Sequence, residues 1–290
     1  SPMATTGQEA IGSMGDDTPL AALSAQPRPF HHFFRQNFSQ VTNPPIDSLR
    51  ERRVMSLSTR FGNDGNFLAL DDSHREILLA ETPVLSAHEM AAITQHYSAR
   101  ITRISTLFAA TRTGGLRTAL GDIVREAEEA VRGGKSFILL TDEGVSPTHA
   151  AIPMILAVSA LHSHLVRCKL RKKSAIIVRS EECADVHALA VMIGAGATVV
   201  HPALAEQTIA AASAAGILGS ISSDEAYRNF REAMSGGLLK IMAKMGISVV
   251  SSCRGGLNFE VIGLSRALVA EFFPGLPSRI SGIGLIGIEK

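Results

Sequence analysis

The sequence predicts an α/β fold with a mostly parallel sheet and crossover helices. From residue 99 onward, short uncharged runs rich in β-branched residues alternate with helical patterns of about 10 to 20 residues. Strands of this kind are typical of a parallel sheet that is covered on both faces. The alternation gives about five strand–helix units, too few for a full eight-stranded barrel.

The helix expected at Gly115–Arg132 has the clearest pattern in this region. Its apolar residues recur every three or four positions and therefore share one helix face. The pair Gly133–Gly134 follows at once and is a strong stop signal. Further helices are expected at Thr148–Val166 with Pro153 in the first turns, Cys183–Ile193, Leu204–Ala214 and Asp224–Met245.

The strands expected between these helices are short and apolar. They are predicted at Ile101–Phe108, Phe137–Thr141, Ser174–Val178, Ala197–Val200 and Ile247–Val250. Because consecutive strands of such a sheet are usually neighbours, we expect Phe137–Thr141 and Ser174–Val178 to be adjacent or one strand apart.

Residues 1–98 have little regular periodicity. We expect them to form an N-terminal arm and connecting segment, followed by the α/β domain at 99–290. Within the arm, Pro27–Phe38 carries phenylalanines at near-helical spacing, which predicts a helix docked on the rest of the molecule. Asp72–Tyr97 contains two short helical patterns on either side of Pro83.

The overall composition argues against nucleic-acid and membrane partners. The chain has 290 residues, 46% of them hydrophobic, and a net charge of +1. That length can bury a substantial core, and the charge offers no attraction for nucleic acid or an anionic surface. The longest apolar run, Ala150–Val166, contains a proline and two histidines and is too short for a membrane span. The N-terminus does not resemble a signal peptide.

The three cysteines, Cys168, Cys183 and Cys253, are widely separated and form no CxxC motif. They suggest reduced thiols in a cytosolic-type compartment. No cysteine cluster suited to an iron–sulfur centre occurs in the sequence.

Two kinds of motif are weak on inspection. Gly282–Gly287 (GIGLIG) matches GxGxxG, but we expect neither a preceding strand nor room for a helix, so a dinucleotide site is not predicted. His162 and His164 are two residues apart and would point to different faces of a helix, whereas zinc on a helix prefers i, i+4 spacing. His31 and His32 are adjacent and equally unsuited, so surface or capped histidines are expected.

Charged residues offer further candidates. Glu9, Asp16 and Asp17 could form an acid/base pair, but turn or capping roles are more typical. Thr141–Ser146 (TDEGVS) follows a predicted parallel strand, where α/β sheets place chemistry, although packing or an interdomain contact is favoured. Lys240 and Lys244, with Arg254 near them in sequence, are i, i+4 on a predicted helix and could meet an anion, or could simply be solvated.

A family resemblance is carried by several long motifs. The irregular N-terminal text includes GSMGDDTPLAALS and QVTNPPIDSLRE, and its prolines restrict the backbone. Later motifs are VMSLSTRFGNDGN, LHSHLVRCKLRKKSAIIV, VHALAVMIGAGATVVHP and GLLKIMAKMGIS. Together they resemble the central domain of glutamate synthase (glutamine–2-oxoglutarate amidotransferase) large subunits. That resemblance implies a rudimentary, incomplete TIM-barrel-like domain, which agrees with the number of strand–helix units.

The resemblance also implies a function for the segment. It would be the central connecting domain that spaces the glutaminase and FMN synthase domains and lines the ammonia tunnel, without being catalytic alone. The family's tunnel-bordering loop corresponds to VTNPPID, which assigns Thr42, Asn43 and Ile46 to the tunnel. The whole enzyme would be an NADPH- or ferredoxin-dependent oxidoreductase making L-glutamate reductively from glutamine and 2-oxoglutarate.

Cofactors and partners follow from the same resemblance. FMN and an iron–sulfur cluster are expected in the full-length enzyme and none in this segment, which also lacks a catalytic or metal-binding assignment. Expected partners are the flanking glutaminase and FMN-binding domains, and a small NADPH-oxidising subunit or ferredoxin. The expected compartment is the cytoplasm, or the plastid stroma in a photosynthetic eukaryote. The chain end at Lys290 lacks a stop signal and suggests an excised segment or a truncated reading frame.

Two other hypotheses stay open at this point. The chain could be an independent barrel-like enzyme that binds flavin or phosphate at its strand ends, or a repurposed binding module. Two stretches depart from the family pattern: Pro202–Ala205 lacks its tyrosine, and Ser252–Leu264 lacks its tyrosine and glutamine.

Overall fold

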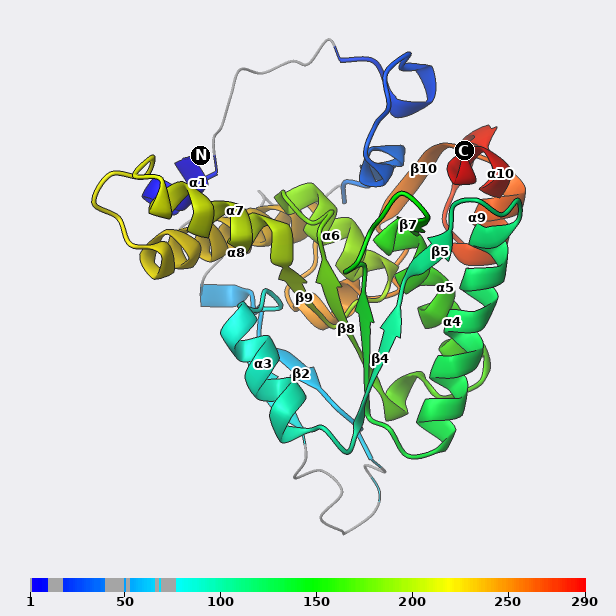
Figure 1. Ribbon diagram of the computed structural model, residues 1–290, viewed down its shortest axis with the longest axis horizontal. Helices are drawn as coiled ribbons and strands as arrows, with labels where there is room; N and C mark the ends of the chain where they lie inside the picture. Colours follow the sequence, from blue (N-terminus) through cyan, green and yellow to red (C-terminus); the bar gives the residue numbers. More distant parts are fainter. Residues whose placement is uncertain (1, 10–17, 40–49, 51–52, 66–67, 69–76) are drawn as a thin grey trace.

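A four-stranded parallel sheet lies at the centre of the molecule (Figure 1). The computed structural model describes residues 2–9, 18–39, 50, 53–65, 68 and 77–290. The order β4–β6–β8–β9 follows the chain, with all pairs parallel. The strands are β4 (Ile101–Ser105), β6 (Phe137–Thr141), β8 (Ala175–Ser180) and β9 (Val199–Pro202). The predicted α/β fold is confirmed, and β6 and β8 are direct neighbours as expected.

The crossover helices pack on one another along one face of this sheet. They are α4 (Gly115–Arg132), α5 (Met154–Arg167) and α6 (Val186–Ala195), followed by α7 (Ala203–Ala214) and α8 (Ser223–Met245). α4 contacts α5, α5 contacts α6, and α6 contacts α8. The bounds of α4 and β6 are those predicted, because an amphipathic helix with a glycine stop and a fully apolar strand leave few alternatives.

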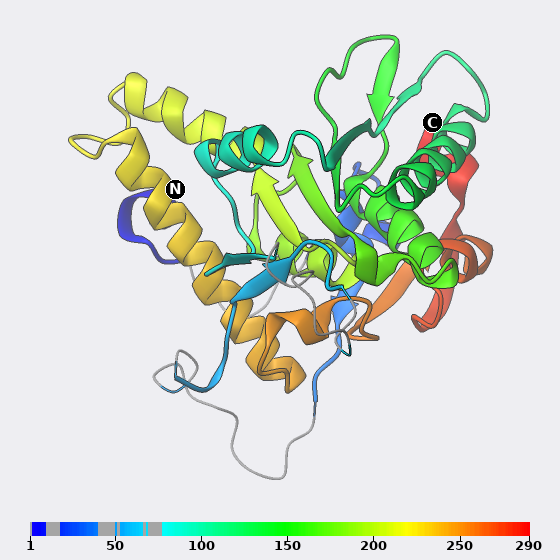
Figure 2. The ribbon, with the colours of Figure 1, turned by 90° about the horizontal axis from the view of Figure 1, so that it is seen from below.

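Alternate side chains of each strand pack into two separate hydrophobic cores, one on each face of the sheet. Ile138 and Leu140 face the helices, whereas Phe137 and Leu139 face the opposite side. That opposite side is covered by the ribbon of β2 (Thr59–Phe61) and β3 (Leu78–Ala80) and by α3 (Ala87–His96), as Figure 2 shows from below. In a barrel this face would line the interior. Within the described residues the four-stranded sheet does not close into a barrel.

Smaller elements surround the sheet. The strand β1 (Phe34–Gln36) pairs antiparallel with β10 (Phe259–Leu264), and β10 pairs parallel with β11 (Ser278–Ile283). A second ribbon joins β5 (Leu107–Ala109) to β7 (His149–Ala151). Among the described residues, further helices are α1 (Pro2–Thr6), α9 (Arg266–Phe272) and α10 (Leu285–Glu289). Turns of 3₁₀ type lie at Ala21–Leu23, Phe30–Phe33, Arg171–Lys173 and Val250–Cys253. The boundary at residue 98 stays a prediction.

Several predicted bounds in the α/β region are wrong. The strand predicted at Ile101–Phe108 is divided into β4 and β5 at Thr106, whose N–H and hydroxyl both donate to the Thr141 carbonyl. The helix predicted at Thr148–Val166 begins only after Pro153, because proline cannot donate and pushes the preceding residue towards extended geometry. The strand predicted at Ile247–Val250 is a single bridge from Val249 to Ser56 followed by a 3₁₀ turn.

The arm differs from prediction in a similar way. Instead of a helix, Pro27–Phe38 holds a 3₁₀ turn and β1, because pairing with β10 fixes its second half as a strand. Of the two helices predicted at Asp72–Tyr97, only the second is found, as α3; β3 stands before Pro83, and residues 72–76 lie outside the described part. No described helix combines the length and apolar character needed to cross a membrane.

Candidate functional site

The residues assigned to the ammonia tunnel lie outside the described part of the structure. This applies to Thr42, Asn43 and Ile46, and also to Asp16 and Asp17. Glu9 is described and exposed. These residues therefore keep the status of sequence-based predictions.

The carboxyl edge of the parallel sheet holds a buried carboxylate. Asp142, which follows β6, is 1% exposed. Its Oδ2 accepts a hydrogen bond of 2.8 Å from the Glu181 backbone N–H, and its Oδ1 lies 3.5 Å from Arg179 Nη1. Burial raises the pKa of Asp142, against the lowering effect of the Glu181 N–H. Asp142, within the predicted TDEGVS turn, thus ties two strand ends together.

A histidine of the arm contacts the same edge. His31 is 6% exposed, and its Nε2 lies 3.2 Å from Asp185 Oδ2. Asp185 also caps α6 by accepting from the Ala188 N–H at 2.7 Å. Burial raises the pKa of Asp185, but hydrogen bonds from His31 and Ala188 outweigh this and lower it to about 2. The expectation of surface or capped histidines agrees with both residues: His31 is buried and paired with Asp185, because the arm folds against α6, and His32 is exposed.

Neither flavin phosphate nor an iron–sulfur cluster fits the groups found here. A phosphate needs backbone donors and positive charge, whereas this edge carries Asp142 and Glu181, and its Arg179 is already paired with both. An iron–sulfur cluster needs grouped thiolates. Cys183 and Cys253 are buried, and burial raises the pKa of both thiols, that of Cys253 to about 11.

The GIGLIG motif has a different context from the one predicted. Gly282 is part of the strand β11, and the short helix α10 follows Gly284. A Cβ added at Gly282 would overlap the backbone of Gly263 in β10. This glycine therefore permits close approach of two strands, which explains its place without a dinucleotide.

An inner polar cluster is built around Arg171. Its Nε donates to His162 Nδ1 at 3.1 Å, and its Nη1 donates to the Ser174 carbonyl at 2.7 Å. Its Nη2 donates to the Gly196 carbonyl at 2.9 Å and to Thr198 Oγ1 at 3.1 Å. The guanidinium thereby joins α5, the start of β8 and the start of β9. This arrangement serves packing, because the four acceptors of these hydrogen bonds all belong to the fold itself.

The His162 ring lies against two glycines. A Cβ added at Gly196 would overlap the ring, and one added at Gly255 would come within 2.7 Å of Nε2. Both glycines have positive φ, 125° and 67°. Burial first, and then the charges of Arg171 and Arg254, lower the pKa of His162 to about 4. The neutral ring is therefore the form that fits this position.

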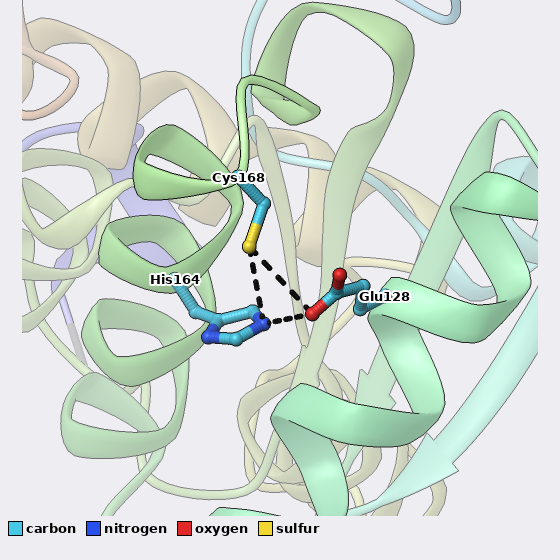
Figure 3. Close-up of side chains that lie close together, drawn as sticks. All are labelled: Glu128, His164 and Cys168. Carbon is cyan, nitrogen blue, oxygen red and sulfur yellow. Dashed lines mark hydrogen bonds and ion pairs between the residues drawn. The ribbon is translucent and has the colours of Figure 1, made fainter.

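An outer cluster lies between α4 and α5 (Figure 3). Glu128 comes from α4, and His164 and Cys168 come from the last turn of α5 and its C-cap. Glu128 Oε2 is 2.5 Å from His164 Nε2 and 3.6 Å from Cys168 Sγ, and that sulfur is 3.5 Å from the same Nε2. Three different ligand atoms therefore converge on one point. The side chains of Glu128 and His164 remain 25% and 22% exposed.

The neighbours of Glu128 hold it in place and ionised. Its other oxygen, Oε1, accepts from Arg132 Nε at 2.8 Å and lies 2.7 Å from Arg132 Nη2. Hydrogen bonds from His164, and then from Arg132, lower the pKa of Glu128 to about 2. Oε2 is thereby directed towards the histidine and the thiol.

The end of α5 is a rigid Schellman motif. The Lys169 N–H donates to the Val166 carbonyl at 3.0 Å, and the Leu170 N–H donates to the Leu165 carbonyl at 2.8 Å. Lys169 has φ 59°, a left-handed backbone that a side chain disfavours. The Cys168 N–H also donates to the His164 carbonyl at 2.9 Å, which fixes the two side chains on one helix face.

Sequence reasoning missed this outer cluster. It compared His164 with His162, which are two apart, and did not compare His164 with Cys168, which are four apart. That i, i+4 spacing was the available signal. Glu128 carried no such signal, since it belongs to another helix. Lys240 is half-buried and Lys244 exposed on α8.

Comparison with known proteins identifies the family. The family described as glutamate synthase central domain matches residues 1–265. The NADPH glutamate synthase large chain of Azospirillum brasilense is 54% identical over 100% of this chain and 19% of its own length. The ferredoxin-dependent glutamate synthase 2 of Synechocystis is 37% identical over 99% of this chain and 19% of its own. The NADH glutamate synthase of Saccharomyces cerevisiae is 36% identical over 97% of this chain and 14% of its own length.

The likeness to solved structures is weaker. A mandelate oxidase variant aligns with 80% of this chain and 89% of its own, with a TM-score of 0.35 and 13% identity, too low for an argument from shape. The match in sequence is much stronger, because it extends over nearly all of this chain in bacterial and eukaryotic relatives. This chain spans less than a fifth of the length of those relatives. The chain therefore belongs to the glutamate synthase family, as its central domain.

Proposed function

We propose that this chain is the connecting domain between the glutaminase and FMN synthase domains of a glutamate synthase. In this role it spaces the two domains and lines the passage for ammonia, while glutamine and 2-oxoglutarate react elsewhere in the enzyme to give L-glutamate. The observation that carries this proposal is the whole-chain match to glutamate synthases, of whose length this chain spans 19%.

The geometry of the sheet supports a scaffolding role. In α/β barrels the carboxyl ends of the strands hold substrate. Here the described groups at that edge are engaged with one another, as with Asp142, Glu181 and Arg179. The face that would line a barrel is packed with side chains from α3 and the β2–β3 ribbon. Such an arrangement suits a rigid spacer.

The tunnel assignment of Thr42, Asn43 and Ile46 rests on the family resemblance and on backbone chemistry. Pro44 and Pro45 restrict the local chain and remove two N–H donors. Asn43 precedes a proline, so its backbone is biased to extended geometry and its carbonyl is free to face a passage. Ile46 is a stiff β-branched residue that can narrow it.

The expected cofactors and partners belong to the rest of the enzyme. FMN and an iron–sulfur cluster would be bound outside this segment. The relatives are named for NADPH, NADH or ferredoxin, so the electron source would be a small NADPH-oxidising subunit or ferredoxin. We expect the purified chain to be colourless, and stoichiometric flavin absorbance would instead favour an independent flavin enzyme.

The coupling of the two half-reactions tests the tunnel directly. In the full-length large chain, Asn43→Ala and Ile46→Ala should leave glutamine hydrolysis intact but loosen its coupling to glutamate formation. The measurement is glutamine consumed per 2-oxoglutarate converted, together with ammonia released to solvent. We expect the ratio to rise above one in both variants, because a widened or wetter wall leaks ammonia.

The matched control is Ile217→Ala, which makes the same chemical change at a side chain that is 76% exposed. It should keep the one-to-one ratio. A one-to-one ratio in the Asn43 and Ile46 variants as well, with normal folding, would mean that this loop is a structural corner and not a tunnel wall.

A further inference from the structure

The cluster of Glu128, His164 and Cys168 differs from a catalytic relay. A nucleophile–histidine–carboxylate relay uses the two ring nitrogens separately, one for the nucleophile and one for the carboxylate. Here the carboxylate oxygen and the thiol sulfur both approach the same Nε2, at 2.5 Å and 3.5 Å. A ring used in this way cannot pass a proton from the thiol to the carboxylate, so thiol catalysis does not account for the arrangement.

The same distances suit a common metal ligand shell. Tetrahedral zinc with ordinary bond lengths places its sulfur, nitrogen and oxygen ligands about 3.4 to 3.6 Å apart. The sulfur lies 3.5 Å from Nε2 and 3.6 Å from Oε2, so two of the three edges already have this length. The third edge, 2.5 Å, is a hydrogen bond that must open by about 0.9 Å to admit an ion.

We propose that Glu128, His164 and Cys168 form a binding site for a divalent transition metal of the zinc class, joining α4 to α5. Thiolate, imidazole and carboxylate are the ligand types zinc takes, and three protein ligands leave a fourth position for water. The partial exposure of the side chains gives an ion access. On binding, the Cys168 thiol releases its proton to solvent, and His164 binds through Nε2 as the neutral ring with its proton on Nδ1.

The residues around the site determine how tightly it would bind a metal ion. The Schellman motif after Cys168 fixes the α5 ligands before any ion arrives. Arg132 orients the carboxylate through its other oxygen but also brings a positive charge next to the site. We therefore expect weaker Zn²⁺ binding than at a structural centre with four thiolates. This site does not depend on the proposed ammonia role.

Cobalt and zinc titrations of the purified, reduced chain test the proposal. Co²⁺ should bind one per chain and give a thiolate-to-metal charge-transfer band with the visible ligand-field bands of a tetrahedral site, and Zn²⁺ should displace it. Cys168→Ser should abolish the charge-transfer band, since Cys183 and Cys253 are buried. His164→Gln and Glu128→Gln should each weaken Zn²⁺ binding at least about tenfold.

Two exchanges serve as matched controls. Glu129→Gln removes the next carboxylate of α4, which pairs with Arg125, and His149→Gln removes an exposed histidine on β7. Both should bind Zn²⁺ within about twofold of the original chain. If Cys168→Ser fails to fold, a second measurement replaces it: Zn²⁺ should protect Cys168 from an alkylating reagent in the original chain, and should protect it less in His164→Gln. Absence of saturable binding, a band that survives Cys168→Ser, or equal weakening in the controls would overturn the proposal.

Discussion

His162 and His164 lie two residues apart on α5, yet they belong to two different kinds of cluster. His162 points inward, where it accepts from Arg171 and its ring lies against two glycines. His164 points towards α4, where its Nε2 lies beside the Glu128 carboxylate and beside the Cys168 thiol from the end of its own helix. The side chains of His164 and Glu128 remain partly exposed. The residue type is the same, and the difference arises from what each helix face packs against.

The comparison shows how packing separates a structural histidine from a candidate ligand. Around His162, Arg171 donates its hydrogen bonds to acceptors of the fold itself, and burial favours the neutral histidine ring. Around His164, a carboxylate oxygen and a thiol sulfur both lie close to the same ring nitrogen, so that three possible metal ligands converge. Changes at the inner cluster should therefore affect stability, whereas changes at the outer cluster should mainly affect metal binding.

The largest expected effect is that of Gly196→Ala. The added Cβ would overlap the His162 ring, and the backbone there has φ 125°, which side chains rarely adopt. We expect a loss of about 4 kcal/mol in the free energy of unfolding, from strain and overpacking together. Urea unfolding measures it.

Gly216→Ala is the control, because Gly216 has φ 70° with no atom within 4 Å of an added Cβ. It should cost only about 1 kcal/mol. Equal losses in the two variants would show that the His162 ring does not press on Gly196.

Acid should weaken the inner cluster next. Burial first, and then Arg171 and Arg254, lower the pKa of His162 from its ordinary 6.5 to about 4. Between these values the unfolded chain binds a proton that the folded chain does not. The stability from this group is therefore complete above pH 6.5 and lost as the pH falls towards 4, by up to about 3 kcal/mol.

The pH effect is measured by urea unfolding of the original chain and of His162→Ala at pH 7, 5.5 and 4.5. The difference in unfolding free energy between the two should narrow as the pH falls, because the variant has no group to protonate. A constant difference across this range would contradict the assignment.

The two histidines can be compared by the same exchange. His162→Ala should cost about 2 to 3 kcal/mol, because it leaves a cavity and an unpaired Arg171 Nε. His164→Ala should cost about 1 kcal/mol or less, because its contacts are partly exposed to water. His162→Asn, which restores an acceptor near the Nδ1 position, should recover part of the loss. Similar losses of unfolding free energy at both positions would contradict the division into a structural His162 and a candidate ligand His164.

The smallest effect is expected at the end of α5. Lys169 holds a left-handed backbone with φ 59°, so Lys169→Gly should stabilise the chain by about 1 kcal/mol. Lys173→Gly, in a 3₁₀ turn, is the control and should give no gain. A thermal melt of both variants decides; a loss in Lys169→Gly would mean that the lysine side chain contributes more than its backbone costs.

Much of the fold could be predicted from residue patterns. The helix α4 and the strand β6 have the predicted bounds, because hydrophobic period and glycine punctuation act locally. β7 and β1 could not be predicted in this way, because each depends on a partner strand far along the chain. Pro153 was a local signal for the late start of α5, but proline is also tolerated in the first turn of a helix, so it did not fix the first residue.

The candidate site also has features that local sequence determines and features that only the tertiary structure determines. The sequence by itself determined the family, the alternating α/β order, and the i, i+4 spacing of His164 and Cys168, since all of these are written in consecutive residues. Only the tertiary structure decided that Glu128 faces them from another helix, that His162 meets Arg171 and two glycines, and that α3 occupies the face a barrel would enclose. The physical reason is that contacts between elements depend on how their faces pack, and periodicity defines a face without naming its partner.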